Sequence, residues 1–396
     1  MAVSLEPELT RRATAQASPP ISSAAMQARA AAFAHDVVMP AIDAWERDGV
    51  YPRAAVAASG LTGLFCPEAV GGAALSYPDG MAVFEELGRG DAALAFSLSM
   101  HNAVAAAVAG HPVLGERWGR ALAAGEGLGG FSLTEPHAGS DATAITTRAE
   151  PDGDGWRVTG RKAWVSLAGE ADLFLVVCKT SADPGHRDIA IVAVERAAAG
   201  VSFPVIYRKA CAAFLPIGEM ELDGAPAILL APPGAGMRAA LGAIDVARCD
   251  IAAIAAGLHA EALDTAVAYA SERQAFGAPI LDLDAIRLPL ADVATELEAS
   301  RLLYRQAAER LGTPDGPLAV AHAKRFCPDV ALRAAIACSE VLGAYGWLLD
   351  HPLARMIALA KMLQVVDGTA EIQRVVIGRS LASSRSPRAS RSRGTS

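Results

Sequence analysis

The sequence is poor in aromatic residues and in basic charge. The first shortage bears on the fold class, and the second on the partners that the protein can bind. Aromatic residues make up 5% of the 396 residues, while apolar residues make up 52%, so alanine, valine and leucine supply much of the apolar share. Because alanine is the best helix former, this composition favours a mainly helical protein. The net charge of −8 argues against a nucleic-acid binder, which would carry a basic face.

Cysteine is scarce and scattered along the chain. None of the six cysteines belongs to a C-x-x-C pair or has a histidine at the spacing of a zinc ligand, so we expect no metal site. The pattern is typical of reduced, mostly buried thiols in a cytoplasmic protein. The cysteines are Cys66, Cys178, Cys211, Cys249, Cys327 and Cys338.

Long apolar runs are also missing. Residues 1–20 show no apolar core of a signal peptide, and apolar stretches such as 103–109 and 251–258 are too short to cross a bilayer. We therefore expect a cytoplasmic protein that binds neither a membrane nor nucleic acid. Residues 1–20 and 384–396 have little to bury, so we expect them to be disordered tails.

Hydrophobic periodicity divides the rest of the chain into three parts. Residues 21–128 have apolar side chains at helical spacing, although the apolar stretch 91–109 suggests a helix interrupted near His101. Residues 129–236 hold short runs rich in β-branched residues, typical of a small β-barrel or sandwich. Residues 237–383 return to long helical segments with broad apolar faces. The sequence therefore predicts an α+β fold: an N-terminal helical domain, a middle β-domain and a C-terminal helical bundle.

One segment stands out by its chemistry. Residues 131–141 read FSLTEPHAGSD. This pattern predicts the end of a strand followed by a loop, in which Thr134 and Ser140 offer hydroxyl groups. Gly139 would permit unusual backbone angles there. Such a loop can present backbone N–H groups to a polar cofactor rim or a phosphate, and an ordinary structural turn fits the pattern as well.

This segment closely resembles the flavin-binding signature of the acyl-CoA dehydrogenases. Other segments resemble the family's later motifs, in the family's order: GRKAWVS at 160–166, ERQAFG at 272–277, LGAYGW at 342–347 followed by HPLAR at 351–355, and DGTAEIQR at 367–374. The resemblance implies the family's architecture: an N-terminal helical domain, a middle β-barrel or sandwich, and a C-terminal four-helix bundle. FAD would lie between the last two domains.

The resemblance implies FAD contacts from every motif. In the family, the tryptophan of the second motif packs against the isoalloxazine and the next hydroxyl residue bonds the flavin edge; these roles fall on Trp164 and Ser166. The family's arginine, here Arg273, reaches the FAD of a neighbouring subunit, and a guanidinium suits a pyrophosphate. The expected cofactor-binding residues are Phe131, Leu133, Thr134, Gly139, Ser140, Trp164, Val165, Ser166, Arg273, Phe276, Glu340, Gly343, Ala344, Thr369 and Glu371.

The family's reaction is the α,β-dehydrogenation of an acyl thioester, in which a carboxylate base removes the α proton and FAD accepts the β hydride. The base is usually the glutamate that opens E-G-T, and here that position is Asp367, on a stem shorter by about 1.5 Å. Some relatives carry the base just before a helix arginine, but that position is Ala247. The expected substrate contacts are Ser140, Asp245, Arg248 and Gly368.

Besides Asp367, three positions expected near the far end of FAD depart from the family pattern. Asp284 and Glu340 stand where relatives have glutamine, and Ala344 replaces a glycine, where the family contacts the far end of FAD across a subunit interface. Acidic residues beside a pyrophosphate are unfavourable. We therefore expect a divergent branch in which FAD sits differently or binds more weakly, with an acyl group carried by CoA or by an acyl-carrier protein.

Two other interpretations stay open. Nitroalkane oxidases resemble this family but carry aspartate at the base position, as this chain does, so an oxidase on the same fold is one of them. A flavin-fold binding protein that has lost its activity is the other. The leading interpretation is an FAD-dependent oxidoreductase of fatty acid metabolism that acts on a CH–CH group. It implies electron-transfer flavoprotein as the acceptor and a homotetramer, or at least a homodimer.

Overall fold

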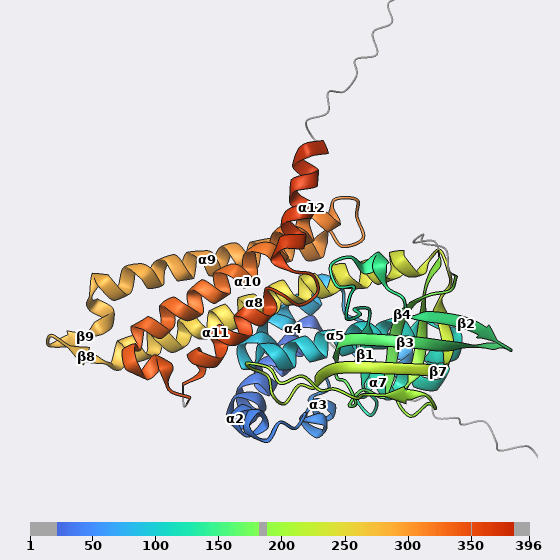
Figure 1. Cartoon of the computed structure of the whole chain (residues 1–396). Helices are drawn as coiled ribbons and strands as arrows, with labels where there is room; N and C mark the ends of the chain where they lie inside the picture. The colour runs from blue at the N-terminus through green and yellow to red at the C-terminus, as the bar shows by residue number, and fades with distance from the viewer. Residues whose placement is uncertain (1–21, 182–187, 350, 384–396) are drawn as a thin grey trace, which may run out of the picture.

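The structure is a computed structural model that describes residues 22–181, 188–349 and 351–383. The tails expected at 1–20 and 384–396 lie outside the described residues. Helices come first, then strands, then helices again (Figure 1), so the expected fold class and three-part architecture are confirmed. The N-terminal part contains α1 (Ser23–Phe33), η1 (Ala34–Val38), α2 (Met39–Asp48), α3 (Arg53–Ser59), η2 (Glu68–Val70), α4 (Tyr77–Gly90), α5 (Ala92–Ala109), α6 (Pro112–Leu114), η3 (Gly115–Gly119) and α7 (Arg120–Ala123).

Helix α5 is continuous through the point where the sequence suggested a break, so that expectation was wrong. Asp91 caps its N-terminus by accepting hydrogen bonds from the N–H groups of Ala93 and Leu94, both at 2.9 Å. Buried Asn102 donates to the carbonyls of Leu61 and Leu98, so the polar side chain is satisfied without breaking the helix. By length and composition α5 could cross a membrane, but 78% of it is buried inside this protein, as in a core helix.

The middle part is a closed β-barrel. Its strands follow the order β1-β4-β2-β3-β7-β5, β6 pairs with β7, and a further pairing of β4 with β5 closes the ring. The strands are β1 (Gly129–Ser132), β2 (Arg148–Asp152), β3 (Gly155–Ser166), β4 (Leu173–Lys179), β5 (Ile189–Glu195), β6 (Val201–Ser202) and β7 (Ile217–Ala231), with η4 (Ala142–Ala144) after the β1 loop.

Strands β4 and β5 are buried on both faces, which explains why their sequences are apolar throughout rather than alternating. Phe174, Val176 and Cys178 belong to the main core. Leu175 and Ile191 point to the other side and pack in a second cluster with residues of α5 and α8. Leu175 and Ile191 also line the cavity described below.

The C-terminal part is a bundle built around one long helix, α8 (Gly236–Glu272), of 37 residues. Its close contact with α4 depends on two glycines: a Cβ on Gly257 would lie 1.9 Å from the Glu85 carbonyl oxygen, and one on Gly88 would lie 2.3 Å from that of Ile254. The remaining elements are β8 (Gln274–Ala275), β9 (Ala278–Pro279), η6 (Ile280–Asp282), α9 (Asp284–Glu309), α10 (Gly316–Val341), η7 (Gly343–Trp347), α11 (Pro352–Leu363) and α12 (Ala370–Ser383).

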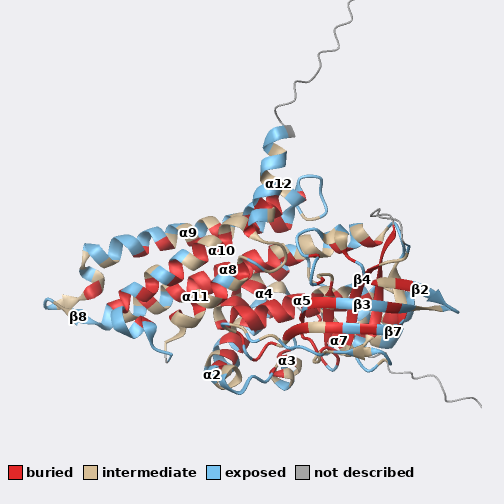
Figure 2. Ribbon diagram, in the orientation of Figure 1, coloured by how far each residue is buried: buried red, intermediate tan, exposed pale blue. Residues whose placement is uncertain are grey.

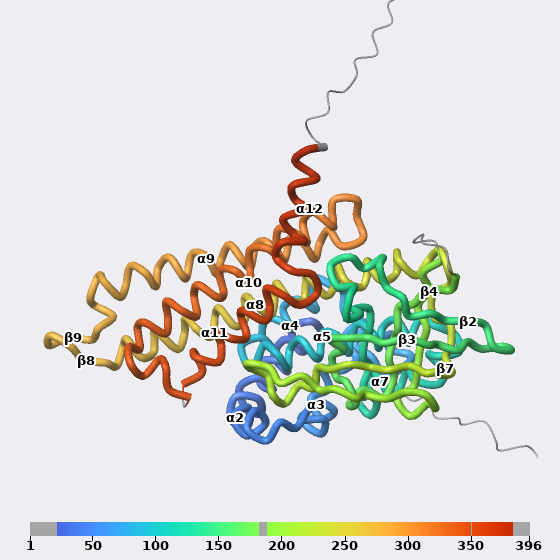
Figure 3. The backbone as a smooth tube through the Cα atoms, viewed as in Figure 1, coloured from blue at the N-terminus to red at the C-terminus, as the bar shows by residue number. Residues whose placement is uncertain are grey.

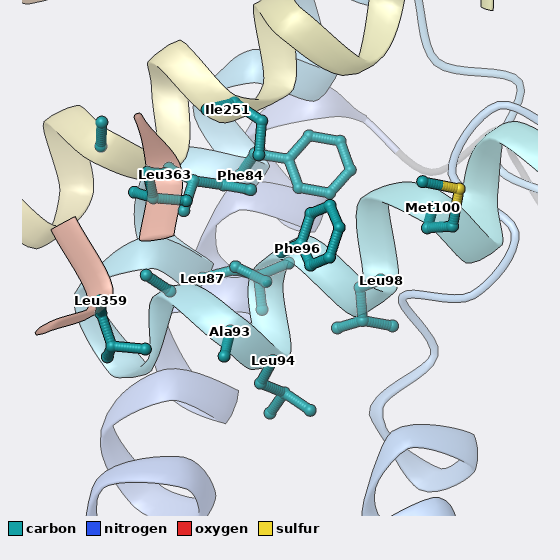
Figure 4. Close-up of a cluster of buried hydrophobic side chains, with 14 of the residues drawn as sticks. Phe84, Leu87, Ala93, Leu94, Phe96, Leu98, Met100, Ile251, Leu359 and Leu363 are labelled. Atoms are coloured by element: carbon teal, nitrogen blue, oxygen red, sulfur yellow. The ribbon is translucent and has the colours of Figure 1, made fainter. Parts of the chain in front are cut away.

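The core crosses the boundaries between the parts. Figure 2 shows α4, α5 and the middle of α8 as largely buried, and Figure 4 shows Phe84, Phe96, Ile251 and Leu363 converging from four helices. The C-terminal helix α12 instead projects away from the body (Figure 3). The chain between α11 and α12 therefore leaves the core at the point where the expected base lies.

Candidate active site

Asp367 lies in the short turn between α11 and α12. Both Asp367 (φ 54°) and Gly368 (φ 95°) have left-handed backbone conformations, which aspartate tolerates better than most residues and glycine adopts freely. A Cβ on Gly368 would lie 3.0 Å from Nη2 of Arg248. The Asp-Gly pair is thus what allows the chain to turn tightly against Arg248.

The carboxyl group of Asp367 faces an otherwise apolar cavity. Its Oδ2 atom is buried and has no hydrogen-bond partner. The cavity has a volume of about 90 Å³ and lies between α5, α8 and the strands β1, β4, β5 and β7. Its lining consists of Met100, Ala103, Val104, Ala107, Phe131, Leu175, Ile191, Leu230, Ala239, Ala243, Ile244, Ala247 and Asp367.

Two cations lie near this carboxyl group without neutralising it by a direct hydrogen bond. Arg248 donates from Nε to the backbone carbonyl of Asp367 at 2.9 Å and from Nη1 to Oδ1 of Asp245 at 2.8 Å. Lys324, fully buried on α10, donates to the carbonyl of Leu363 at 2.6 Å. Burial raises the pKa of Asp367, and the charges of Lys324 and Arg248 lower it in part. The site therefore holds a carboxyl group with a raised pKa and one oxygen that has no hydrogen-bond partner.

The barrel presents an exposed aromatic ring. Trp164 has a left-handed backbone (φ 56°) at a register shift between β3 and β7, and such bulges re-aim a side chain. Its side chain is 63% exposed, whereas Val165 and Ser166 beside it are buried. The Tyr207 ring supports it at a centroid distance of 4.7 Å. An exposed indole that is supported by a second ring offers a flat surface for a planar ring system.

The loop after β1 is fixed by a buried ion pair. Lys162 donates to Oε1 of Glu135 at 2.9 Å and to the carbonyl of Leu133 at 2.9 Å, and both charged side chains are about 99% buried or more. Glu135 also accepts from the N–H groups of Thr146 and Thr147. Glu135 of FSLTEPHAGSD and Lys162 of GRKAWVS thus pair with each other, a role that neither motif indicates when taken alone.

Comparison with known proteins agrees with this architecture. Family models for the acyl-CoA dehydrogenase N-terminal, middle and C-terminal domains match residues 22–126, 130–225 and 234–382. An acyl-CoA dehydrogenase of Bacillus subtilis is 33% identical over 364 residues, covering 88% of this chain and 95% of the relative. The chain belongs to the acyl-CoA dehydrogenase family.

Other members of the acyl-CoA dehydrogenase family are also similar to this chain. A glutaryl-CoA dehydrogenase of Desulfococcus multivorans is 33% identical, with 87% of this chain and 92% of the relative covered. The structure of butyryl-CoA dehydrogenase from Megasphaera elsdenii superposes with a TM-score of 0.86 at 28% identity, covering 91% and 98% of the two chains. The structure of a glutaryl-CoA dehydrogenase with glutaryl-CoA gives a TM-score of 0.86 at 32% identity, covering 92% and 95%.

Members of this family are FAD-dependent oxidoreductases that act on CH–CH bonds, and this chain is one of them. Its residues fit the cofactor, because strand β3 presents the exposed Trp164 indole and the Tyr207 ring packs against it. Thr134 and Ala163 tie the two flavin motifs together through a 2.9 Å backbone hydrogen bond. FAD supplies the hydride acceptor when it is bound.

Two other expected FAD contacts, Gly139 and Ser140, lie in the loop after β1. Gly139 and Ser140 are exposed. Gly139 is not among the residues with positive φ, and a Cβ there would meet nothing within 4 Å. The expectation that this loop uses the conformational freedom of Gly139 was therefore wrong.

The expected contacts to the far end of FAD lie elsewhere on the chain. Arg273 is the C-cap residue of α8, and Phe276 is 94% exposed in the β8–β9 turn. Figure 1 shows that hairpin at the opposite end of the bundle from the barrel. Tyr269 and Tyr345, with ring centroids 6.3 Å apart, join this end of α8 to η7. The other expected contacts near η7 are Glu340, Gly343 and Ala344. One chain therefore does not bring these residues to its own Trp164.

The last two expected cofactor contacts lie at the start of α12. Thr369 accepts a hydrogen bond from the N–H of Ile372 at 3.4 Å, and exposed Glu371 pairs with Arg374 at 2.9 Å. The departure at Asp284 is offset locally, because its carboxylate pairs with Arg287 one turn along α9. The acidic charge that the sequence placed near the cofactor is thus partly neutralised.

Three buried polar residues near Asp367 were missed by the sequence analysis. They are Lys324, Ser99 and Asp250, and Ser99 donates to Oδ2 of Asp250 at 2.6 Å. All three are at most 1% exposed. The available signal was a charged or polar residue on the apolar face of an alanine-rich helix, which is easily mistaken for a solvent-facing position.

Proposed function

We propose that this enzyme dehydrogenates an acyl thioester across its α and β carbons, with Asp367 as the base that takes the α proton. The observation that carries the proposal is the buried, unpartnered Oδ2 of Asp367 at the edge of an apolar cavity. A base for a carbon acid needs a free lone pair, a site that excludes water, and a pKa close to the working pH. Burial excludes water and raises the pKa of Asp367.

The surrounding residues orient this base. Arg248 binds the backbone carbonyl of Asp367 rather than its carboxylate, so it fixes the turn and leaves the proton acceptor free. The apolar walls from α5, α8 and the barrel would hold the acyl chain and exclude water. Ala247, where some relatives carry the base, lines the same cavity but has no group that could accept a proton, which supports the assignment to Asp367.

The test is anaerobic mixing of the FAD-loaded enzyme with a panel of acyl-CoA esters while the flavin absorbance is followed. We expect bleaching with at least one ester and its loss in Asp367→Asn, which removes the basic oxygen and keeps the shape. Asp152→Asn, an exposed residue of the β2–β3 hairpin, is the control and should bleach normally. Equal bleaching in Asp367→Asn would reject this base.

We propose CoA as the carrier of the acyl group, since the relatives named above are described as dehydrogenases of CoA esters. Acyl-carrier protein is the alternative carrier. The same panel presented on a carrier protein separates the two: a rate that is much higher on the carrier protein would reject CoA as the natural carrier.

We propose electron-transfer flavoprotein as the electron acceptor. A solved structure that concerns the electron transferring flavoprotein of Acidaminococcus fermentans contains a chain with a TM-score of 0.86 and 30% identity to this one. Reduction of purified electron-transfer flavoprotein by the enzyme and its ester would test this acceptor. Failure of that reduction, with intact bleaching of the enzyme's own flavin, would reject it.

An oxidase of the nitroalkane type is the second candidate, and the aspartate at position 367 favours it. The discriminating measurement is reoxidation of the reduced enzyme by dissolved oxygen. Slow reoxidation and no turnover of nitroalkanes are expected of the dehydrogenase. Rapid reoxidation with nitroalkane turnover would favour the oxidase instead.

A further inference from the structure

We infer that the acyl cavity ends at a polar floor, formed by Asp250 and Ser99, that binds a hydrogen-bonding group on the acyl chain. The inference rests on the proposed thioester dehydrogenation and adds the class of substrate: a short acyl group that carries a hydroxyl or an amino group. Neither the sequence motifs nor the apolar lining residues indicate such a group.

The two residues continue the helix faces that line the cavity. On α8, Ala239, Ala243 and Ala247 line it, and Asp250 follows one turn later, at the spacing that keeps side chains on one helix face. On α5, Ala103 and Ala107 line it, and Ser99 precedes Ala103 by four residues.

The hydrogen bond of 2.6 Å from Ser99 to Asp250 joins these two helix faces beyond the lining residues. Asp367 also lines the cavity, and its charge acts on Asp250. The Ser99–Asp250 pair therefore lies within electrostatic range of the base.

Asp250 is only half satisfied. It is fully buried, Oδ2 accepts from Ser99, and Oδ1 has no hydrogen-bond partner. A buried polar atom without a partner is costly, and such atoms in native proteins call for a bound group that completes them.

The chemistry of Asp250 sets what that group can be. Burial raises its pKa, and the nearby Asp367 charge raises it further, so the neutral acid can both donate and accept through Oδ1. A hydroxyl group suits the neutral acid. An amino group would bind as an ammonium to the ionised form, whose charge it would balance. A plain alkyl chain would leave Oδ1 unpaired.

The test compares butyryl-CoA, 4-hydroxybutyryl-CoA and 4-aminobutyryl-CoA by anaerobic flavin bleaching and by the rise in melting temperature on binding. In the wild type, we expect kcat/KM for one substituted ester to exceed that for butyryl-CoA by about tenfold or more. Asp250→Val should reverse this ratio and favour butyryl-CoA. Asp250→Asn should keep the preference for the hydroxyl ester and lose any preference for the amino ester.

Ser99→Ala provides a second variant in case Asp250→Val does not fold, and it should reduce the same ratio. Bleaching by butyryl-CoA with a ratio that no variant changes would overturn the polar floor and leave the dehydrogenase proposal standing. If no thioester bleaches the wild-type flavin, the dehydrogenase proposal itself fails, and the substrate class fails with it. The two failures are thus distinguishable.

Discussion

At the scale of single residues, the central feature is a carboxyl group whose pKa is set by opposing effects. Burial raises the pKa of Asp367, while Lys324 and Arg248 lower it. Arg248 is held by Asp245 and by the backbone of the turn, whereas Lys324 donates to the carbonyl of Leu363. Lys324 is therefore a positioning residue that acts on the base through its charge and through the end of α11.

Replacing Lys324 by methionine should shift the pH dependence of the reaction. Loss of this positive charge removes an effect that lowers the pKa of Asp367, so that pKa rises and the base becomes protonated at a higher pH. The acidic limb of the kcat/KM profile should move to higher pH in Lys324→Met and stay in place in Lys361→Met, which changes an exposed lysine of α11. An unmoved acidic limb in Lys324→Met would contradict this role.

Sequence analysis found Asp367 but not its neighbours Lys324 and Asp250. Asp367 lies in a motif whose order and spacing mark it. Lys324 and Asp250 lie on helices with the ordinary helical period, where a charged residue usually faces water. Only the packing of α8, α10 and α5 shows that these side chains are buried. Helical periodicity alone does not reveal which faces of a central helix are covered by neighbouring helices.

At the scale of elements, the turn between α11 and α12 depends on Gly368. Its φ of 95° disfavours any side chain, and a Cβ would lie 3.0 Å from Nη2 of Arg248, which would have to move. Gly368→Ala should lower the free energy of unfolding by about 1–2 kcal/mol, the cost of a left-handed non-glycine residue. It should also slow flavin reduction, because Arg248 must shift away from the Asp367 carbonyl.

A matched substitution distinguishes this effect from a general response to alanine. Gly378 lies within α12 with nothing within 4 Å of a Cβ, so Gly378→Ala should be neutral or slightly stabilising. Denaturant unfolding and stopped-flow reduction of both variants provide the comparison. Equal effects at the two positions would contradict the role given to Gly368.

The buried Glu135–Lys162 pair should dominate the stability of the barrel loop. Lys162→Met leaves a buried carboxylate without its partner, which should cost about 3–5 kcal/mol of unfolding free energy. Arg157→Met removes an exposed partner of Asp152 and should cost less than about 1 kcal/mol. Chemical denaturation of both variants measures the difference, and similar losses would contradict a special role for the buried pair.

The same pair predicts a dependence on acid. Burial alone would raise the pKa of Glu135, but Lys162 and the hydrogen bonds outweigh it and lower the pKa from 4.5 to about 2. A lowered carboxylate pKa contributes stability above the unfolded value, and that stability is lost as the pH falls from about 4.5 to about 2. A Glu135→Gln/Lys162→Met double variant should lose less stability in this range.

The sequence predicted the order of the elements well and some of their details poorly. Alternation of apolar residues with helical and strand periods was enough to divide the chain into helices, strands and helices. The expected break in α5 was wrong because Asn102 finds partners in a distant loop, which periodicity cannot show. Closure of the sheet into a barrel rather than a sandwich depends on the β4–β5 pairing. The sequence of a strand alone does not predict which strands it pairs with.

At the scale of the whole molecule, the expected FAD contacts lie in two separated regions. The barrel carries Trp164, whereas Arg273 and Phe276 lie at the other end of the bundle (Figure 1). The far end also exposes Phe276 at 94%, Leu349 at 91% and Trp347 at 77%, more than a soluble surface usually leaves in one place. We propose that a second copy covers this end and that Arg273 completes the partner's FAD site.

If Arg273 completes the partner's FAD site, the amount of bound FAD should depend on the oligomeric state. The wild type should sediment as a dimer or tetramer, and Phe276→Ser should shift it to smaller species that release FAD. Val50→Ser, at a 62% exposed position of the N-terminal part, should change neither property. A monomeric wild type that retains FAD fully would contradict the shared site.

The central claim is that the Asp367 carboxylate removes the α proton of an acyl thioester. The most direct measurement is the anaerobic rate of flavin reduction with a reactive acyl-CoA and with the same ester deuterated at the α carbon, in the wild type and in Asp367→Asn. The account predicts slower reduction with the deuterated ester in the wild type and no reduction in Asp367→Asn. Reduction of Asp367→Asn at the wild-type rate, with the same isotope effect, would contradict it and assign the proton to another group.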